Sequence, residues 1–353
     1  MEKRSIMQFR RGLAACLAAA VVMSSAVFAQ RNNQQPQRSK AEQADLVALS
    51  SAVDFAAAGQ PANDIPITWD RNHFMRAADL TGILAFEATV DKSALSGKDV
   101  AVYIRLMDKA QIDKVAELAK MSEKDRAAAA KTAGPVNYPV QALLFTELPA
   151  DGKLSRRVSV PPGEYELFLA VKDKAKDEKA KPGKVGILRK SIVVPEYDGS
   201  LTTSDVIVAD KVEEMAQPLP QNKQDDNPYV FGPYRFQPTS SNKFAKTGEL
   251  NVVFWVYDAA VSPTTGKPDV QVEYNFYTKA ADGEKFFNKM MPVVLNAMTL
   301  PPDFDYTKTG KQMTQLQSVG LTPFPPGDYR LEIKVTDKTN NKTVTRNVNF
   351  NVA

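Results

Sequence analysis

The chain has 353 residues, with 45 Lys and Arg against 41 Asp and Glu, and a formal net charge of +4. It holds one histidine, His73, and one cysteine, Cys16. These counts argue against Ser-His-Asp and Cys-His catalysis and against zinc sites, which usually need several His or Cys ligands. The small charge gives no electrostatic footprint for nucleic acid. We therefore expect no cofactor, no metal, no catalytic residue and no nucleic-acid partner.

Residues 1–29 have the pattern of a secretory signal peptide: a basic start, an apolar stretch and small residues before a polar break at Gln30. Cleavage after Ala29 would remove Cys16 and lower the formal charge to +1, because the leader carries four basic residues and one acidic one. No later apolar run reaches membrane-spanning length. The sequence thus predicts a periplasmic or extracellular protein, with no disulfide and no transmembrane segment after signal removal.

A lipoprotein is the alternative, since Leu13-Ala14-Ala15-Cys16 matches a lipobox by letters. Against it, the apolar run lies mostly after the cysteine.

Residues 30–43 are polar and predict a disordered lead-in. From 44 to 59, Leu46, Leu49 and Val53 keep a helical spacing that Gly59 ends. This pattern predicts a helix that docks on the domain that follows.

Two peptides, 164 positions apart, are copies of one pattern. PPGEYELFLAVKDK begins at Pro161 and PPGDYRLEIKVTDK at Pro325. In each, Pro-Pro-Gly predicts a sharp turn, and the alternating apolar residues after the Tyr predict a strand with one buried face. Phe168 and Ala170 interrupt the alternation in the first copy, which indicates an outer face that is partly covered. The turn-proximal Tyr resembles the tyrosine corner of immunoglobulin-like sandwiches.

The fold expected from this repeat is mainly β: two immunoglobulin-like or fibronectin-III-like β-sandwich domains in tandem. The first spans 64–196, with strands near 82–90, 100–106, 140–146, 154–160 and 187–194. Ile112, Val115 and Leu118 at helical spacing predict a helical insertion over 111–133.

Residues 197–228 are expected to be a linker, within which 204–209 form an opening strand. The second β-sandwich is expected over 229–353. Its strands are expected near 229–236, 250–257, 270–277, 313–319 and 343–352, besides the repeated one.

From Leu201 onward the chain resembles a known family. The matching segments are LxxSDVxVA at 201–209, YVxG at 229–232, FxVYD at 254–258 and PPGDY at 325–329. Together they resemble the β-sandwich region of bacterial exported GWxTD-domain proteins. The Gly-Trp-x-Thr-Asp signature is absent, because neither Trp69 nor Trp255 follows a glycine. The resemblance implies an exported sandwich module and no activity.

The candidate binding residues are four aromatics in one stretch: Tyr229, Phe231, Tyr234 and Phe236. Aromatic rings on a sandwich face can stack on sugars or anchor proteins, and the same alternate spacing also fits core-facing positions. The core interpretation is favoured. His73 is interpreted as a surface or packed ring, and the series Asp303, Asp305, Thr307 only partly matches a calcium loop.

The expected function is non-catalytic: an exported binding, scaffolding or envelope-assembly module acting through protein–protein contacts. Its expected partner is a protein of the cell envelope, with the insertion at 111–133 as the contact surface. The alternative is a carbohydrate-binding protein that uses exposed aromatics of 229–236 on a glycan. A carboxylate- or metal-dependent enzyme is the third hypothesis.

Overall fold

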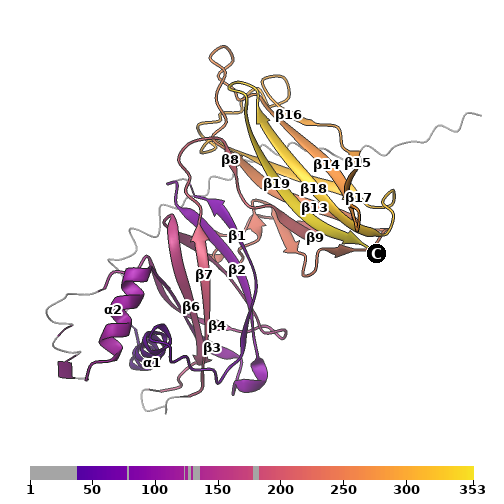
Figure 1. The fold of residues 1–353 in the computed structure, drawn as a ribbon. Helices are drawn as coiled ribbons and strands as arrows, with labels where there is room; N and C mark the ends of the chain where they lie inside the picture. The colour runs from indigo at the N-terminus through magenta and orange to yellow at the C-terminus, as the bar shows by residue number, and fades with distance from the viewer. Residues whose placement is uncertain (1–37, 78, 123, 126–128, 130–135, 178–182) are drawn as a thin grey trace, which may run out of the picture. The chain divides into compact units, whose positions relative to one another are not determined.

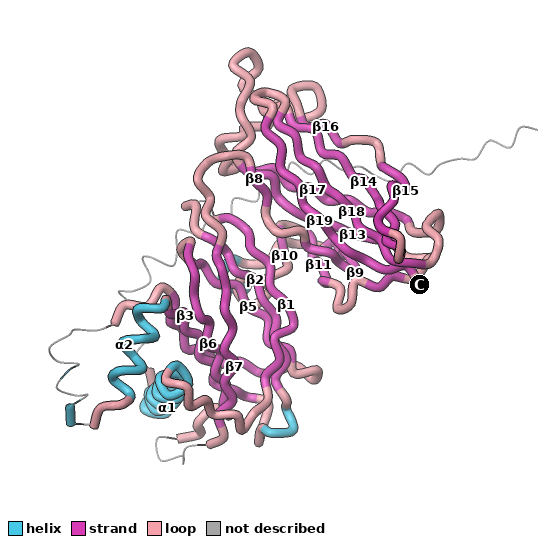
Figure 2. The backbone as a smooth tube through the Cα atoms, in the orientation of Figure 1, coloured by secondary structure: helices cyan, strands magenta, loops and turns pink. Residues whose placement is uncertain are grey.

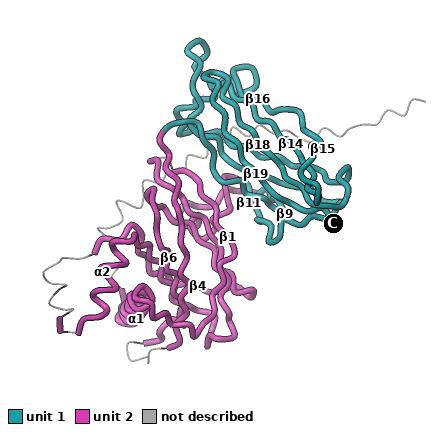
Figure 3. The backbone as a smooth tube through the Cα atoms, viewed as in Figure 1, with its two compact units in different colours: residues 1–22, 199–214, 234–353 teal, residues 23–198, 215–233 magenta. Residues whose placement is uncertain are grey.

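A computed structural model describes residues 38–353 apart from 78, 123, 126–128, 130–135 and 178–182 (Figure 1). The signal-peptide prediction and part of the insertion therefore lie outside the described residues. The described chain forms two compact units (Figure 3). The first holds residues up to 198 together with 215–233, and the second holds 199–214 and 234–353.

The first unit is a β-sandwich of a three-stranded sheet, β1-β2-β5, and a four-stranded sheet, β4-β3-β6-β7, with two helices beside the second (Figure 2). Its main elements are α1 Lys40–Ala57, β1 Ile67–Arg76, β2 Gly82–Val90, β3 Asp99–Met107, α2 Lys109–Ala119, β4 Val140–Glu147, β5 Lys153–Val160, β6 Gly163–Asp173 and β7 Val185–Val194. Short segments complete it: two 3-10 turns, η2 Lys92–Ala94 and η3 Gln221–Lys223, and β10 Val230–Phe231.

The second unit is a sandwich with the same strand order. One sheet runs β11-β9-β13-β17, with β8 paired to β13, and the other runs β12-β19-β18-β14-β15, with β16 paired to β14. The elements are β8 Thr202–Thr203, β9 Ile207–Glu214, β11 Tyr234–Pro238, β12 Lys243–Phe244, β13 Glu249–Tyr257, β14 Val270–Ala280, β15 Gly283–Lys289, β16 Val293–Leu295, β17 Gln312–Gly320, β18 Gly327–Asp337 and β19 Lys342–Val352. The mainly β, tandem immunoglobulin-like prediction is confirmed.

The two repeated peptides form equivalent strands. β6 and β18 each begin at the glycine of Pro-Pro-Gly and end at the aspartate, with φ of +147° at Gly163 and +152° at Gly327. Both pair on one side with the third long strand of their sandwich and on the other with the last. Tyr329 donates its hydroxyl to the Pro325 carbonyl at 2.7 Å, and Tyr165 donates to the Pro162 carbonyl at 3.3 Å. The tyrosine-corner interpretation thus holds in both copies.

The four-stranded sheet of the first sandwich is buried on both faces. One face packs on the three-stranded sheet through residues such as Leu167 and Leu169. The other packs against α1 and α2, where Phe168 and Ala170 meet Leu49 of α1. Helix cover therefore explains why the first copy lacks a clean alternation, and the predicted docking of the N-terminal helix is confirmed.

Several predicted boundaries were wrong. The helix begins at Lys40, inside the predicted lead-in, because Ser39 and Glu42 form a capping box. In the insertion, α2 begins at Lys109 after a second capping box, made by Asp108 and Gln111. Strands β1, β15 and β16 were missed, since charged and proline-flanked residues obscure their alternation.

The strand predicted at 204–209 to open the second domain corresponds to β9, but the rest of the predicted linker, residues 197–228, has a different role. Strand β9 in its middle pairs with β13, so the second sandwich begins well before Tyr229. Residues 215–233 instead group with the first unit. The backbone N–H of Arg157 on β5 donates to the Asp225 carbonyl at 2.9 Å, and the side chains of Arg157 and Arg156 pair with Asp225 and Asp226. Composition alone suggested a free linker, whereas paired charges hold this segment against β5.

Candidate functional surfaces

Three of the four predicted aromatics are buried and offer no exposed ring face. Tyr229 and Phe231 belong to the first unit, and Tyr234 and Phe236 to the second. Tyr229, Phe231 and Phe236 are buried, and Tyr234 is half-buried. Stacking on a sugar requires exposed ring faces, so the carbohydrate-binding alternative loses the residues on which it depended.

His73 packs edge-on against Tyr229, with 5.5 Å between ring centroids, and its Nδ1 lies 3.0 Å from the Tyr229 hydroxyl. Burial, helped by the nearby charge of Arg71, lowers the pKa of His73 to about 4. The ring is therefore neutral near pH 7, and its contact with Tyr229 helps to fix residues 215–233 on the first sandwich.

In the calcium-like series Asp303, Asp305, Thr307, the carboxylate of Asp305 already accepts hydrogen bonds from its own loop. Asp305 accepts the backbone N–H groups of Thr307 and Lys308 at 3.0 and 3.1 Å, and the Lys308 bond lowers the pKa of Asp305. The described residues hold no group of three or more His, Cys, Asp or Glu side chains that could bind a metal ion.

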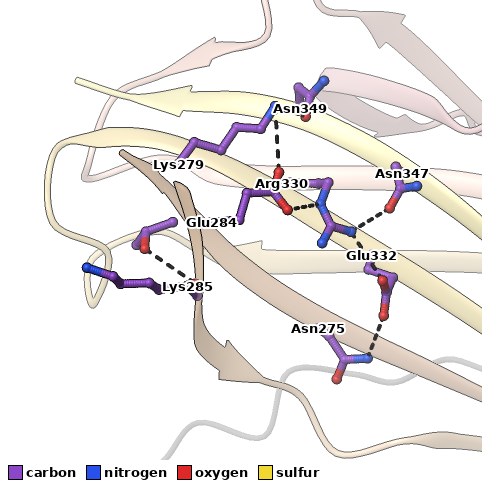
Figure 4. Close-up of polar contacts among 9 residues, drawn as sticks. Asn275, Lys279, Glu284, Lys285, Arg330, Glu332, Asn347 and Asn349 are labelled. Atoms are coloured by element: carbon purple, nitrogen blue, oxygen red, sulfur yellow. Dashed lines mark hydrogen bonds and ion pairs between the residues drawn. The ribbon is translucent and has the colours of Figure 1, made fainter. Parts of the chain in front are cut away.

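A connected polar network covers part of the outer face of the second sandwich (Figure 4). Its centre is Arg330 on β18, which donates to Glu284 at 2.8 Å, Glu332 at 3.2 Å and Asn347 at 2.7 Å. Lys279 joins the network through an ion pair with Glu284 at 3.8 Å and donates to Asn349 of β19 at 3.1 Å. Because Glu284, Glu332 and Asn347 lie on β15, β18 and β19, three strands fix the guanidinium at once.

Aromatic side chains continue this surface. The guanidinium of Arg330 lies 4.3 Å from the ring centroid of Tyr277, which in turn packs edge-on against Phe286. Phe286 is 58% exposed. A register shift opposite Phe276 and Tyr277 makes Phe287 the extra residue of β15 and turns it into the core, so the bulge separates the two phenylalanines onto opposite faces. Met291 and Met298, in the segments that flank β16, are also highly exposed.

We define the Arg330 surface as these side chains on the outer face of the second sandwich: Tyr277, Glu284, Phe286, Arg330, Glu332 and Asn347. Sequence reasoning missed it, because Phe286 lies on an unpredicted strand and its partners are distant in the chain. The only sequence signal was the row of outward polar residues on β18 and β19.

Two ion pairs join α1 to the four-stranded sheet of the first sandwich, and one of them is buried. The ammonium of Lys172 donates to the carboxylate of Asp45 on α1, and both side chains are almost fully buried. Arg105 of β3 donates to Asp54 of α1 and to the Tyr103 hydroxyl. These contacts join α1 to the sheet, so this side of the molecule is built mainly for docking its own helix.

Helix α2 forms most of the described part of the predicted contact surface at 111–133, and its inner side is buried. Its Val115 is buried in the cluster with α1, and Ile112 packs against the same cluster. The outward positions, such as Asp113, Lys114 and Glu117, carry mixed charges. The described part of the insertion is therefore first a cover for the four-stranded sheet.

Comparison with known proteins gives distant likenesses. No protein-family model matches the chain, and no curated protein matches it. Among solved structures, Escherichia coli alpha-2-macroglobulin activated by porcine elastase is 10% identical over 82% of this chain and 22% of its own, with a TM-score of 0.21. A DUF4785 family protein from Legionella pneumophila is 9% identical over 82% of this chain and 56% of its own, with a TM-score of 0.24.

The chain spans less than two thirds of the length of either structure. Likenesses this weak carry no conclusion about function, and the resemblance to GWxTD-domain proteins stays a prediction. In the described part of the chain, neither helix has the length and apolar composition needed to cross a bilayer.

Proposed function

We propose that this chain is an exported, non-catalytic binding module whose second sandwich holds a protein partner of the cell envelope through the Arg330 surface. The observation that carries the proposal is the fixed guanidinium of Arg330 between Tyr277 and two carboxylates, next to the exposed ring of Phe286.

Tyr277, Phe286 and Arg330 are of the residue types found at interface centres, whereas the glutamates of this surface are of a depleted type. Aromatic residues, Met and Arg are enriched at the cores of protein interfaces, and Tyr and Arg are frequent hot spots. Arg330 is already immobilised by its hydrogen bonds, so binding would cost less side-chain entropy than for a free arginine. Phe286 supplies apolar area that water covers in the free protein.

Export rests on the leader at 1–29, and the non-catalytic role rests on the single histidine and the single, leader-borne cysteine. Fractionation of cells expressing the whole chain tests the first point: recovery only in the cytoplasm, with the leader retained, would overturn export.

The experiment for the binding role uses in-cell crosslinking with mass spectrometry on the whole chain and two variants, Phe286→Ser and Arg330→Ala. A protein crosslinked to the parent chain should be lost or strongly reduced with both variants. Val261→Ser is the matched control, because Val261 is also an exposed apolar residue of the second unit, outside this surface. A neighbour captured equally by parent and both variants would contradict the proposed surface.

The helical insertion remains the second candidate surface, tested without deletion. Removing α2 would uncover the buried cluster beneath it, so loss of binding could reflect misfolding. Charge reversal at Asp113, Lys114 and Glu117 leaves that cluster intact. Loss of the same neighbour with this variant, and not with Phe286→Ser, would favour the insertion over the Arg330 surface.

A further inference from the structure

Strand β4 is the edge of the four-stranded sheet and pairs with β3 alone among the described strands. Its register with β3 is continuous from Val140 to Glu147, with no bulge. Between Val140 and Thr146 the strand has no charged residue and no proline. An edge with these properties is open to pairing with another chain.

The other edges of the first sandwich carry protection. Strand β1 has a bulge next to Arg71. At the edge of β5, the backbone N–H of Arg157 is already bonded to the backbone carbonyl of Asp225. At β7, the N–H of Asp64 donates to the Val185 carbonyl and Asn63 bridges Gly186, so the chain before β1 covers that edge. Strand β4 therefore differs from the other edge strands, β1, β5 and β7, because it has neither a bulge nor a covering segment among the described residues.

The direction of the backbone groups on β4 follows from one contact. The N–H of Leu148 donates to the Lys98 carbonyl, across the β3–β4 pair. Backbone N–H and C=O groups alternate sides along a strand. The backbone groups of the even-numbered residues of β4 therefore point towards β3. Gln141, Leu143 and Phe145 then direct their backbone donors and acceptors away from the sheet.

The side chains of β4 are apolar on both faces. Val140 and Leu144 pack against the core between the sheets, and Leu143 and Phe145 pack against the cluster under the helices. All four remain half-exposed. A strand that extends this sheet must therefore be apolar on both faces, unlike β19, which has one wet face.

We propose that β4 pairs with β4 of a second copy of this chain, antiparallel about a two-fold axis at Leu143. In this register Leu143 lies opposite Leu143 of the other copy, and Gln141 lies opposite Phe145. Each outward-facing pair exchanges two backbone hydrogen bonds. The second copy supplies the two-sided apolar strand that this edge requires, and no like charges meet between residues 140 and 146. An isologous contact of this kind closes as a dimer.

The test is disulfide formation in the whole chain carrying Cys16→Ser, which leaves no native cysteine. Directly opposed residues of a hydrogen-bonded pair have Cα atoms about 5.5 Å apart, a distance that a disulfide spans. Leu143→Cys should crosslink into a dimer under mild oxidation. Gln141→Cys is the matched control, because it faces Phe145 of the other copy and should stay largely uncrosslinked. Equal crosslinking of both variants would overturn the proposed register.

Sedimentation of the uncrosslinked chain measures the dimer itself. Leu143→Lys should raise the dimer dissociation constant more than about tenfold, because it opposes two like charges and removes two buried leucines. Leu143→Pro removes an outward donor while leaving the bonds to β3, so it should give a folded monomer. A parent chain that is monomeric at every concentration would overturn the proposal, whether or not β4 accepts a strand from another protein.

Discussion

Asp173 and Asp337, 164 positions apart, end equivalent strands and make equivalent contacts with a neighbouring loop. Asp173 accepts the backbone N–H groups of Ser96 and Gly97 at 2.9 and 3.2 Å. Asp337 accepts the N–H of Ala260 at 2.6 Å. In both sandwiches this loop leads into the strand that pairs with the aspartate's own strand. The repeat therefore preserves the aspartate's hydrogen bonds to the loop as well as the strand.

The two aspartates should differ in their contribution to stability. Asp337 is fully buried, so Asp337→Ala leaves backbone donors unpaired and should cost about 1–3 kcal/mol. Asp173 is partly exposed and water can replace it, so Asp173→Ala should cost about 1 kcal/mol or less. Urea unfolding followed by domain-specific probes measures both. Equal shifts for the two variants would contradict this reasoning.

The buried pair of Asp45 and Lys172 should be far more sensitive than any surface pair. Asp45→Ala leaves an uncompensated buried ammonium and should destabilise the first unit by about 3–5 kcal/mol. Adding Lys172→Met should recover much of this loss, since no buried charge then remains. Asp282→Ala, which breaks an exposed pair with Lys285, is the control and should change stability by less than about 1 kcal/mol. Thermal unfolding compares the three variants.

The first unit should lose stability in mildly acidic solution because of His73. Its folded pKa of about 4 lies below the ordinary value of 6.5, so between these pH values the unfolded chain binds a proton that the folded chain does not. Stability from this source is complete above pH 6.5 and falls by up to about 3 kcal/mol as the pH approaches 4.

NMR titration can follow this directly, because His73 is the only histidine of the chain. Its ring signals should titrate near pH 4 in the folded protein. His73→Phe should flatten the pH dependence of unfolding over the same range. A midpoint near 6.5 in the native state would refute the buried, neutral ring.

The two tyrosine corners should also differ. Tyr329→Phe removes a short hydrogen bond from a buried ring and should cost about 1 kcal/mol. Tyr165→Phe removes a longer bond from a half-buried ring, where water can take over, and should cost clearly less. Chemical denaturation of both variants is the measurement, and a larger loss for Tyr165→Phe would show that the corners are not graded by burial.

The amino-acid sequence by itself determined the mainly β class and the duplicated strand. Pro-Pro-Gly followed by alternating apolar residues is a local pattern, and the backbone has few ways to satisfy it. Even the interruption at Phe168 and Ala170 predicted a covered outer face, which α1 and α2 provide.

Only the tertiary structure decided the surfaces. Residues 215–233 have the composition of a linker, yet Asp225 and Asp226 meet arginines of β5 that are distant in sequence. The Arg330 surface joins strands separated by tens of residues, and a one-residue bulge sends Phe286 outward and Phe287 inward. The predicted aromatics of 229–236 are mostly buried, because other elements pack over them. Alternation fixes which residues share a face, but the packing of other elements decides whether that face is solvent-exposed or buried.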